Sequence, residues 1–243
     1  MGLPTDLRAV LLDIDGTLVD SNDAHAGAWQ KALLEFGHDV SKSAIRDWIG
    51  KGGDRLLPEL TGIAEASKEG RAISARRKEL FRDHYLPKLR MFPRADELVV
   101  RMFDQGLLLA AATSATRSEV LALLKIAGVD DLIHVETTAD DVSSSKPAPD
   151  VVNAALEMLR VPPERAVFIG DTPYDVEAGL RAGVPVIAVE SGGWSGRDLK
   201  GAIEVYRDVE DLHERWDESF FGTGRMPAPR PRHGRMPRGA VPY

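Results

Sequence analysis

Two aspartates and a glycine follow a short apolar run near the start of the chain. Residues 10–12 lead into Asp13, and Asp15 and Gly16 come directly afterwards. If the run is a buried β-strand, Asp13 and Asp15 point the same way at its carboxyl end, because side chains alternate along a strand. Two like charges this close repel unless a cation, a proton or a lysine offsets them. The pair is therefore a candidate for chemistry, and the alternative is an ordinary strand that runs into an Asp-Gly turn.

Polar residues also follow the later predicted strands, and a lysine lies between two of those strands. These residues are Thr113 and Ser114, then Lys146, then Asp171 and Asp175. Ligands of an open parallel sheet bind outside the carboxyl ends of its strands, so we expect all of these side chains at one edge. Three acids there would bind a hard divalent cation, Mg²⁺ in particular, and a lysine and a hydroxyl would complete a phosphate site. Taken alone, Lys146 would be an ordinary surface lysine before a proline turn.

The rest of the chain supplies the elements that must position these residues. Residues 20–91 have apolar side chains at helical spacing between glycine-rich breaks, which predicts an all-helical unit. From residue 93 onward helices and strands alternate, which is typical of a parallel sheet with helical crossovers. We therefore predict an α/β domain, residues 1–19 and 92–216, that the helical unit interrupts after the first strand.

Composition limits the classes of function. The chain has 243 residues, 43% of them hydrophobic, so it can bury a sizeable core. Its net charge of −7 argues against a general nucleic-acid or membrane binder. The absence of cysteine excludes disulfides, a thiolate nucleophile and cysteine-bound zinc. Without a signal peptide or an apolar run long enough to span a bilayer, we expect a cytoplasmic protein, a monomer or homodimer, that acts on small molecules.

The end of the chain has a different composition. Residues 217–243 are rich in arginine, proline and glycine, and Gly-Arg-Met-Pro occurs twice, beginning at Gly224 and Gly234. Such a segment buries little apolar surface, so we predict that it is disordered. A basic arm that binds nucleic acid or an acidic partner is the alternative, and the acidic charge of the rest of the chain weakens it.

Four motifs together resemble one known family. They are Asp13-Ile14-Asp15-Gly16-Thr17-Leu18-Val19-Asp20-Ser21, Thr113, Lys146 and Gly170-Asp171-Thr172-Pro173-Tyr174-Asp175. In this order they resemble the haloacid dehalogenase superfamily of hydrolases, over about residues 8–216. The subgroup resembled is the phosphoglycolate phosphatase and β-phosphoglucomutase type. The resemblance implies a Rossmann-like core, and it implies that residues 20–91 are a helical cap.

The resemblance also implies a magnesium-dependent phosphatase that acts on a small phosphorylated metabolite in two steps. Asp13 would attack the phosphorus and become an aspartyl-phosphate, and Asp15 would protonate the leaving alcohol and later activate water. Crowding beside other acids would raise the pKa of Asp15. Thr113 and Lys146 would hold the phosphoryl oxygens. The implied ligands of Mg²⁺ are the Asp13 carboxylate, the Asp15 backbone carbonyl, Asp171, and Asp175 directly or through water.

Substrate contacts are predicted on both units. On the core side they are Gly16, Thr17, Asp20 and Ser114, and on the cap side they are Lys51, Gly52, Gly53 and Arg55. The glycines would let the backbone approach a ligand, and the two cations would meet an anionic group. The alternative for the cap set is a loop with solvated charges. We interpret His25 and His84 as packing or surface residues rather than ligands.

Three other functions remain open. A phosphosugar mutase of the β-phosphoglucomutase type would use the same residues but would have to exclude water. A signalling domain phosphorylated on aspartate, or a catalytically idle interaction protein, would share the acids and the fold. The helical insertion and the complete set of motif residues argue against these last two. Asp15 favours a phosphate ester over a haloacid or a phosphonate.

Overall fold

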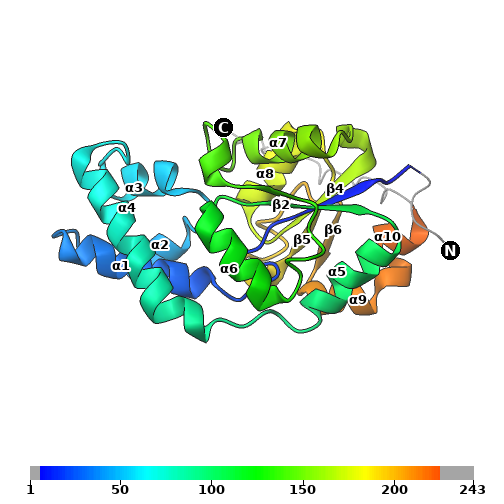
Figure 1. The fold of residues 1–243 in the computed structure, drawn as a ribbon, viewed down its shortest axis with the longest axis horizontal. Helices are drawn as coiled ribbons and strands as arrows, with labels where there is room; N and C mark the ends of the chain where they lie inside the picture. Colours follow the sequence, from blue (N-terminus) through cyan, green and yellow to red (C-terminus); the bar gives the residue numbers. More distant parts are fainter. Residues whose placement is uncertain (1–5, 225–243) are drawn as a thin grey trace, which may run out of the picture.

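Six parallel strands form one sheet at the centre of the molecule, in the order β3-β2-β1-β4-β5-β6 (Figure 1). The computed structural model describes residues 6–224. The strands are Ala9–Leu12 (β1), Leu108–Ala112 (β2), Val135–Thr137 (β3), Ala166–Gly170 (β4), Val186–Val189 (β5) and Glu204–Tyr206 (β6). The chain builds outward from β1 in one direction and then, from β4, in the other. The place where the order reverses therefore lies between β1 and β4, and the predicted Rossmann-like sheet is confirmed.

Helices cover both faces of this sheet. They are α5 (Ala95–Asp104), α6 (Arg117–Ala127), α7 (Asp150–Leu159), α8 (Pro173–Arg181) and α9 (Val209–Glu214). Val10 and Leu12 of β1 pack in one apolar cluster with residues of α5, α6 and α9. Ala9 and Leu11, which face the other way, pack in a second cluster with α7 and α8. A strand buried on both sides explains why the run before Asp13 is continuously apolar.

The insertion after β1 is helical and lies beside the sheet (Figure 1). Its elements are α1 (Asn22–Glu35), α2 (Lys42–Arg46), α3 (Gly53–Thr61), α4 (Lys68–Leu80), a π-helical turn (Phe81–Tyr85) and a 3₁₀ turn (Leu86–Lys88). Ser41 and Ser67 cap α2 and α4 through their hydroxyls. We use the word cap for residues 20–91 and core for the rest. No helix within residues 6–224 combines the length and the apolar character that crossing a membrane requires.

The cap joins the core through two antiparallel connections. Val19, which leaves the core, forms a β-bridge with Met91, which returns to it. The N–H of Asp20 donates to the carbonyl of Arg90 at 3.0 Å, and the N–H of Phe92 donates to the carbonyl of Leu18 at 2.9 Å. The boundaries that we predict, 19/20 and 91/92, fall at this stem.

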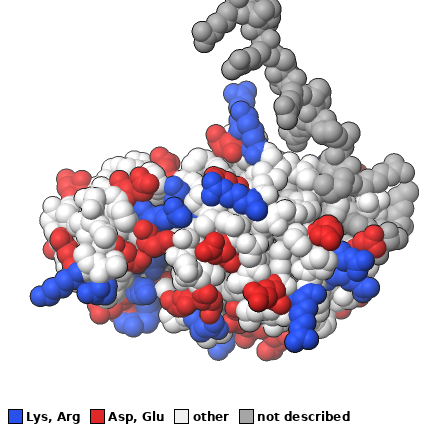
Figure 2. All heavy atoms as spheres, turned by 90° about the horizontal axis from the view of Figure 1, so that it is seen from above, with Lys and Arg blue, Asp and Glu red and all other residues white. Residues whose placement is uncertain are grey.

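Charged side chains are spread over the surface without forming one block. Figure 2 shows acidic and basic residues interspersed on the face that it draws, with no broad basic area over the described residues. Nucleic-acid binders present a concentrated basic surface. The face drawn in Figure 2 therefore gives no support to that class of partner.

The predicted disorder from residue 217 is wrong for residues 217–224. A 3₁₀ turn, Trp216–Glu218, is followed by α10, Phe220–Thr223. Phe221 is fully buried and stacks on Trp216, with 4.5 Å between the ring centres. These aromatic residues supply the apolar area that the segment needs to fold against the core, and composition alone concealed it. The remainder of the predicted tail, 225–243, lies outside the described residues.

We expect Phe221→Ala to lower the free energy of unfolding by about 3–5 kcal/mol, because it removes a buried aromatic ring and leaves a cavity. Phe36→Ala is the matched control, since Phe36 is 37% exposed, and it should change the free energy by less than about 1 kcal/mol. Urea unfolding of both variants measures the two values. Equal losses would contradict the described packing of α10.

Candidate active site

Three carboxylates meet at the carboxyl edge of the sheet. Asp13 follows β1, where its N–H donates to the carbonyl of Ile169 at 2.8 Å, and Asp171 follows β4. Asp175 comes from the first turn of α8, where its carboxylate accepts from the hydroxyl of Thr172 at 2.6 Å and from the N–H of Thr172 at 2.9 Å. Carboxylate oxygens of Asp13, Asp171 and Asp175 lie within 4.8 Å of one another. The reversal of the strand order thus brings together acids that are far apart in sequence.

Lys146 lies at the centre of this group. Its ammonium donates to Asp13 at 2.7 Å and to Asp175 at 2.6 Å, and the residue is 1% exposed. Burial alone would lower the pKa of Lys146, but the charges of Asp13 and Asp175 raise it above its usual value. The lysine is therefore a fixed positive charge at neutral pH.

One lysine does not offset three buried acids. Burial and the charge of Asp175 raise the pKa of Asp171 to about 7. Burial also raises the pKa of Asp13 well above its usual range, against the opposing effect of Lys146. Both shifts show a shortage of positive charge among hard oxygen donors, which is the setting that a divalent cation such as Mg²⁺ fits. The residues therefore fit the predicted metal through Asp13, Asp171 and Asp175, and the side chain of Asp15 lies outside this group.

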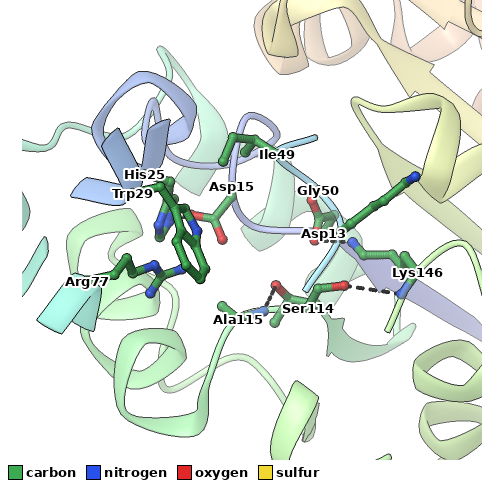
Figure 3. A pocket seen from close by; sticks show the side chains of 12 residues that line it. Asp13, Asp15, His25, Trp29, Ile49, Gly50, Arg77, Ser114, Ala115 and Lys146 are labelled. Atoms are coloured by element: carbon green, nitrogen blue, oxygen red, sulfur yellow. Dashed lines mark hydrogen bonds and ion pairs between the residues drawn. The ribbon is translucent and has the colours of Figure 1, made fainter. Parts of the chain in front are cut away.

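Asp15 contacts the cap instead. Its carboxylate accepts from the hydroxyl of Ser21 at 2.5 Å. It also lies 2.8 Å from Nε2 of His25, and Figure 3 shows these two side chains together. Burial would raise the pKa of Asp15, but His25 and the hydrogen bonds from His25 and Ser21 lower it below the usual value. Our prediction of a raised pKa for Asp15 is therefore wrong in this structure. His25 does pack, on Phe81 at 4.0 Å between ring centres, yet it also belongs to the site.

A pocket that is open at its mouth lies between the core and the cap, beside these residues (Figure 3). The core contributes Asp13, Asp15, Thr113, Ser114, Ala115 and Lys146, and the cap contributes His25, Trp29, Ile49, Gly50, Lys51 and Arg77. The hydroxyl of Thr113 accepts from the N–H of Ala115 at 3.1 Å, and that of Ser114 accepts from the N–H of Lys146 at 3.4 Å. The pocket wall is therefore built by both units, with the acid and lysine residues on the core side.

Three predicted substrate contacts of the core do not line the pocket. Thr17 donates its hydroxyl to Asp171 at 3.1 Å, so it supports the acid group. Gly16 has φ of 79°, and a Cβ there would lie 2.2 Å from Oδ2 of Asp171, so only glycine fits. Asp20 is exposed in the stem. None of these three residues lines the pocket, so their roles in binding substrate stay predictions.

The predicted cap residues divide into two groups. Lys51 lines the pocket, and its ammonium lies 3.8 Å from the ring centre of Trp48 and 4.6 Å from that of Tyr174. The N–H of Gly52 donates to the hydroxyl of Ser145 at 3.0 Å. Gly53 borders an adjoining cavity, and the half-buried Arg55 lines neither space. Of the two predicted cations, the structure thus brings only Lys51 to the pocket.

Several residues that we did not single out complete the site. Asn22 donates its side-chain amide to Asp171 at 3.0 Å. Arg77 of α4 forms an ion pair with Glu119 of α6, which joins the cap to the core beside the pocket. Burial would raise the pKa of Glu119, but Arg77 lowers it, so this pair stays charged. No spacing in the sequence relates these partners, because each pair joins the cap to the core.

Known proteins share this architecture. Residues 10–189 match the model of the haloacid dehalogenase-like hydrolase family. A phosphoglycolate phosphatase of Rhodospirillum rubrum is 30% identical over 84% of this chain and 89% of its own length. A pyrophosphatase of Oceanobacillus iheyensis is 27% identical over 86% of this chain and 94% of its own length.

Solved structures agree with the sequence matches. A hydrolase from Pseudomonas syringae superimposes with a TM-score of 0.81 at 29% identity, over 87% of this chain and 98% of its own. A protein from Bacteroides vulgatus, named as a candidate β-phosphoglucomutase, has a TM-score of 0.76 at 28% identity, over 87% of this chain and 88% of its own.

The strand order and the polar residues at the sheet edge define the class of Rossmann-like α/β enzymes that bind a small ligand outside the strand ends. Within that class, the chain belongs to the haloacid dehalogenase-like hydrolase family. The predicted family and subgroup are thereby confirmed, and so is the predicted enzyme class, a phosphatase.

The raised pKa of Asp171 predicts how metal-free protein responds to pH. Below the ordinary pKa of 3.8 this group is protonated whether the chain is folded or not, and its contribution to stability is lost as pH rises toward the folded value of about 7. Asp171→Asn removes the buried charge. We therefore expect the difference between the two melting temperatures, variant minus natural protein, to increase from about pH 5 to about pH 8 in EDTA.

Asp104→Asn is the control, because Asp104 is exposed at the end of α5. Its melting temperature should track that of the natural protein at each pH. A constant difference between Asp171→Asn and natural protein across the range would contradict the raised pKa.

Proposed function

We propose that the protein hydrolyses a small phosphorylated metabolite, of the phosphoglycolate or sugar phosphate type, with the help of Mg²⁺ and through an aspartyl-phosphate. The observation that carries this proposal is the placement of Asp13. Its carboxylate lines the pocket, bonded to Lys146 and grouped with Asp171 and Asp175. A carboxylate so placed can attack an electrophile that enters from the cap side.

Asp13 acts as the nucleophile in the first step. A bond forms between its carboxylate oxygen and phosphorus while the bond from phosphorus to the alcohol oxygen breaks. Lys146 places positive charge beside the phosphoryl oxygens, and Thr113 lines the same wall. Mg²⁺, when held by Asp13, Asp171 and Asp175, supplies further charge stabilisation there.

Asp15 carries the protons. In its protonated form it donates to the leaving alcohol, and in its ionised form it takes a proton from water. The water oxygen bonds to phosphorus while the bond from phosphorus to the Asp13 oxygen breaks, which releases phosphate and restores Asp13. The lowered pKa of Asp15 keeps the ionised form dominant at neutral pH, which suits the second step. Ser21 and His25 hold the carboxylate in place for both steps.

The cap limits the size of the substrate. The pocket adjoins a second cavity of about 160 Å³ between cap and core, and Trp29, Arg77 and Ser114 line both. The phosphoryl group would lie beside Asp13, and the alcohol portion would extend into the second cavity. The relative named as a phosphoglycolate phosphatase and the neighbour named as a candidate β-phosphoglucomutase support a small phosphorylated metabolite.

A phosphosugar mutase is the second candidate, supported by the Bacteroides vulgatus neighbour and by the cap over the pocket. Incubation with a sugar monophosphate and Mg²⁺ separates the two candidates. We expect inorganic phosphate to accumulate. Accumulation of an isomeric sugar phosphate without phosphate release would favour the mutase.

We expect Asp13→Asn to lower the turnover of a small aryl phosphate by at least about 10⁴-fold, because an amide cannot replace the nucleophile. The melting temperature should not fall, since the variant removes a buried charge. Asp104→Asn should turn over like natural protein. A folded Asp13→Asn variant with normal phosphate release would refute the proposal.

Removal of the metal provides a separate test. Natural protein treated with EDTA should lose phosphate release, and excess Mg²⁺ should restore it, because the uncompensated acids need a cation before a phosphate dianion can approach. Phosphate release measured with and without Mg²⁺ decides this. Full activity in EDTA would show that Lys146 alone is sufficient.

A further inference from the structure

A carboxylate of the cap holds the residue that precedes Lys146. Asp54, in the first turn of α3, accepts from the hydroxyl of Ser145 at 2.5 Å and from the N–H of Ser145 at 3.2 Å. Neither residue belongs to the acid group or to the pocket around Asp13, and both line the second cavity that adjoins this pocket. The contact spans from the cap to the core, between residues 91 positions apart in sequence.

The cap satisfies most of the hydrogen bonding of Ser145. This residue is 3% exposed, its hydroxyl also accepts from the N–H of Gly52 at 3.0 Å, and its carbonyl accepts from the N–H of Ala148 at 3.1 Å. A Cβ at Gly52 would lie 2.6 Å from Asp54 and 2.7 Å from Ser145, so the close approach requires glycine. Without the cap, both donors of Ser145 would lose their charged acceptor.

Ser145 is bonded directly to Lys146, so its placement affects the lysine. The segment 142–145 has no regular secondary structure, and Lys146 is held by Ser114 at its N–H and by Asp13 and Asp175 at its ammonium. A hydrogen bond to an ionised acceptor is stronger than one between neutral groups, and Asp54 accepts two of them. Asp54 therefore fixes the main chain at the point from which the lysine side chain departs.

We propose that Asp54 is a positioning residue that couples the seating of the cap to the placement of Lys146. The inference rests on the proposed function for the role of Lys146. When α3 lies on the core, Asp54 holds the backbone that carries the lysine, so the phosphoryl site is complete only under a seated cap. The segment 51–55, which includes the first turn of α3, would then assemble the site through Asp54 as well as line the pocket through Lys51.

The variants Asp54→Ala and Asp54→Asn test the proposal, with Glu59→Ala as the matched control on the exposed side of α3. With a small aryl phosphate and Mg²⁺, we expect Asp54→Ala to lower kcat roughly 10-fold or more and to change KM by less than about 3-fold. Asp54→Asn retains one acceptor and should be intermediate. Glu59→Ala should match natural protein.

A readout independent of turnover is amide hydrogen exchange of the full chain, followed residue by residue by NMR. Asp54→Ala should speed exchange at Ser145 and also at Lys146, roughly 10-fold each, and leave the amides of β1 unchanged. Faster exchange at Ser145 alone, with Lys146 and kcat unchanged, would overturn the proposal and leave a simple loop contact. If natural protein releases no phosphate from any ester, the proposed function fails, while the exchange at Lys146 still decides the coupling.

A double variant checks that Asp54 acts through Ser145. Ser145→Ala keeps the N–H but removes the hydroxyl, so it should lower kcat less than Asp54→Ala does. The fall in kcat for Asp54→Ala with Ser145→Ala should be smaller than the product of the separate falls, because the two residues share one contact. Independent, multiplicative effects would contradict the proposed route.

Discussion

Mutual repulsion among buried carboxylates is the constraint on which the site depends. Asp13, Asp171 and Asp175 lie together with little solvent, and Lys146 is bonded to two of them. The raised pKa values of Asp13 and Asp171 show that this one positive charge is insufficient. A group of this kind is costly as structure alone, and the proposed divalent cation and phosphoryl transfer would account for it.

The fold meets this constraint through main-chain geometry. Parallel strands end at one edge, and the reversal of strand order between β1 and β4 leaves an opening there into which Asp13 and Asp171 project. Residues outside the pocket support the acid group: Thr17 and Asn22 donate to Asp171, and Gly16 leaves room for it. The strands therefore determine where Asp13 and Asp171 lie, and neighbouring residues hold the carboxylate of Asp171 in place.

The sequence predicted the core of the site well, because local patterns carried the information. The apolar run before Asp13 is a central strand, and Thr113 and Asp171 directly follow the strands β2 and β4. The pKa of Asp15 was predicted with the wrong sign, because the neighbour that decides it is His25 on the cap and not another acid. Helical spacing shows that His25 lies on a helix but not which core residue it will meet.

The prediction for the end of the chain failed for a different reason: the average composition of the segment concealed two adjacent aromatic residues. Arginine, proline and glycine dominate residues 217–243, yet Phe220 and Phe221 are buried beside Trp216. Two adjacent aromatic residues can bury enough area to order one helical turn when a third lies close by. A composition averaged over the whole segment could not reveal this.

Contacts between cap and core surround the pocket on several sides. Tyr174 donates its hydroxyl to the carbonyl of Asp47 at 2.6 Å, Arg46 donates to the carbonyl of Gly192, and Arg77 pairs with Glu119. Each is polar, so water can replace it when the cap lifts, unlike a large apolar interface. A cap held in this way can open to admit substrate and still exclude bulk water when seated. The stem at Val19 and Met91 is the covalent anchor about which such a movement would take place.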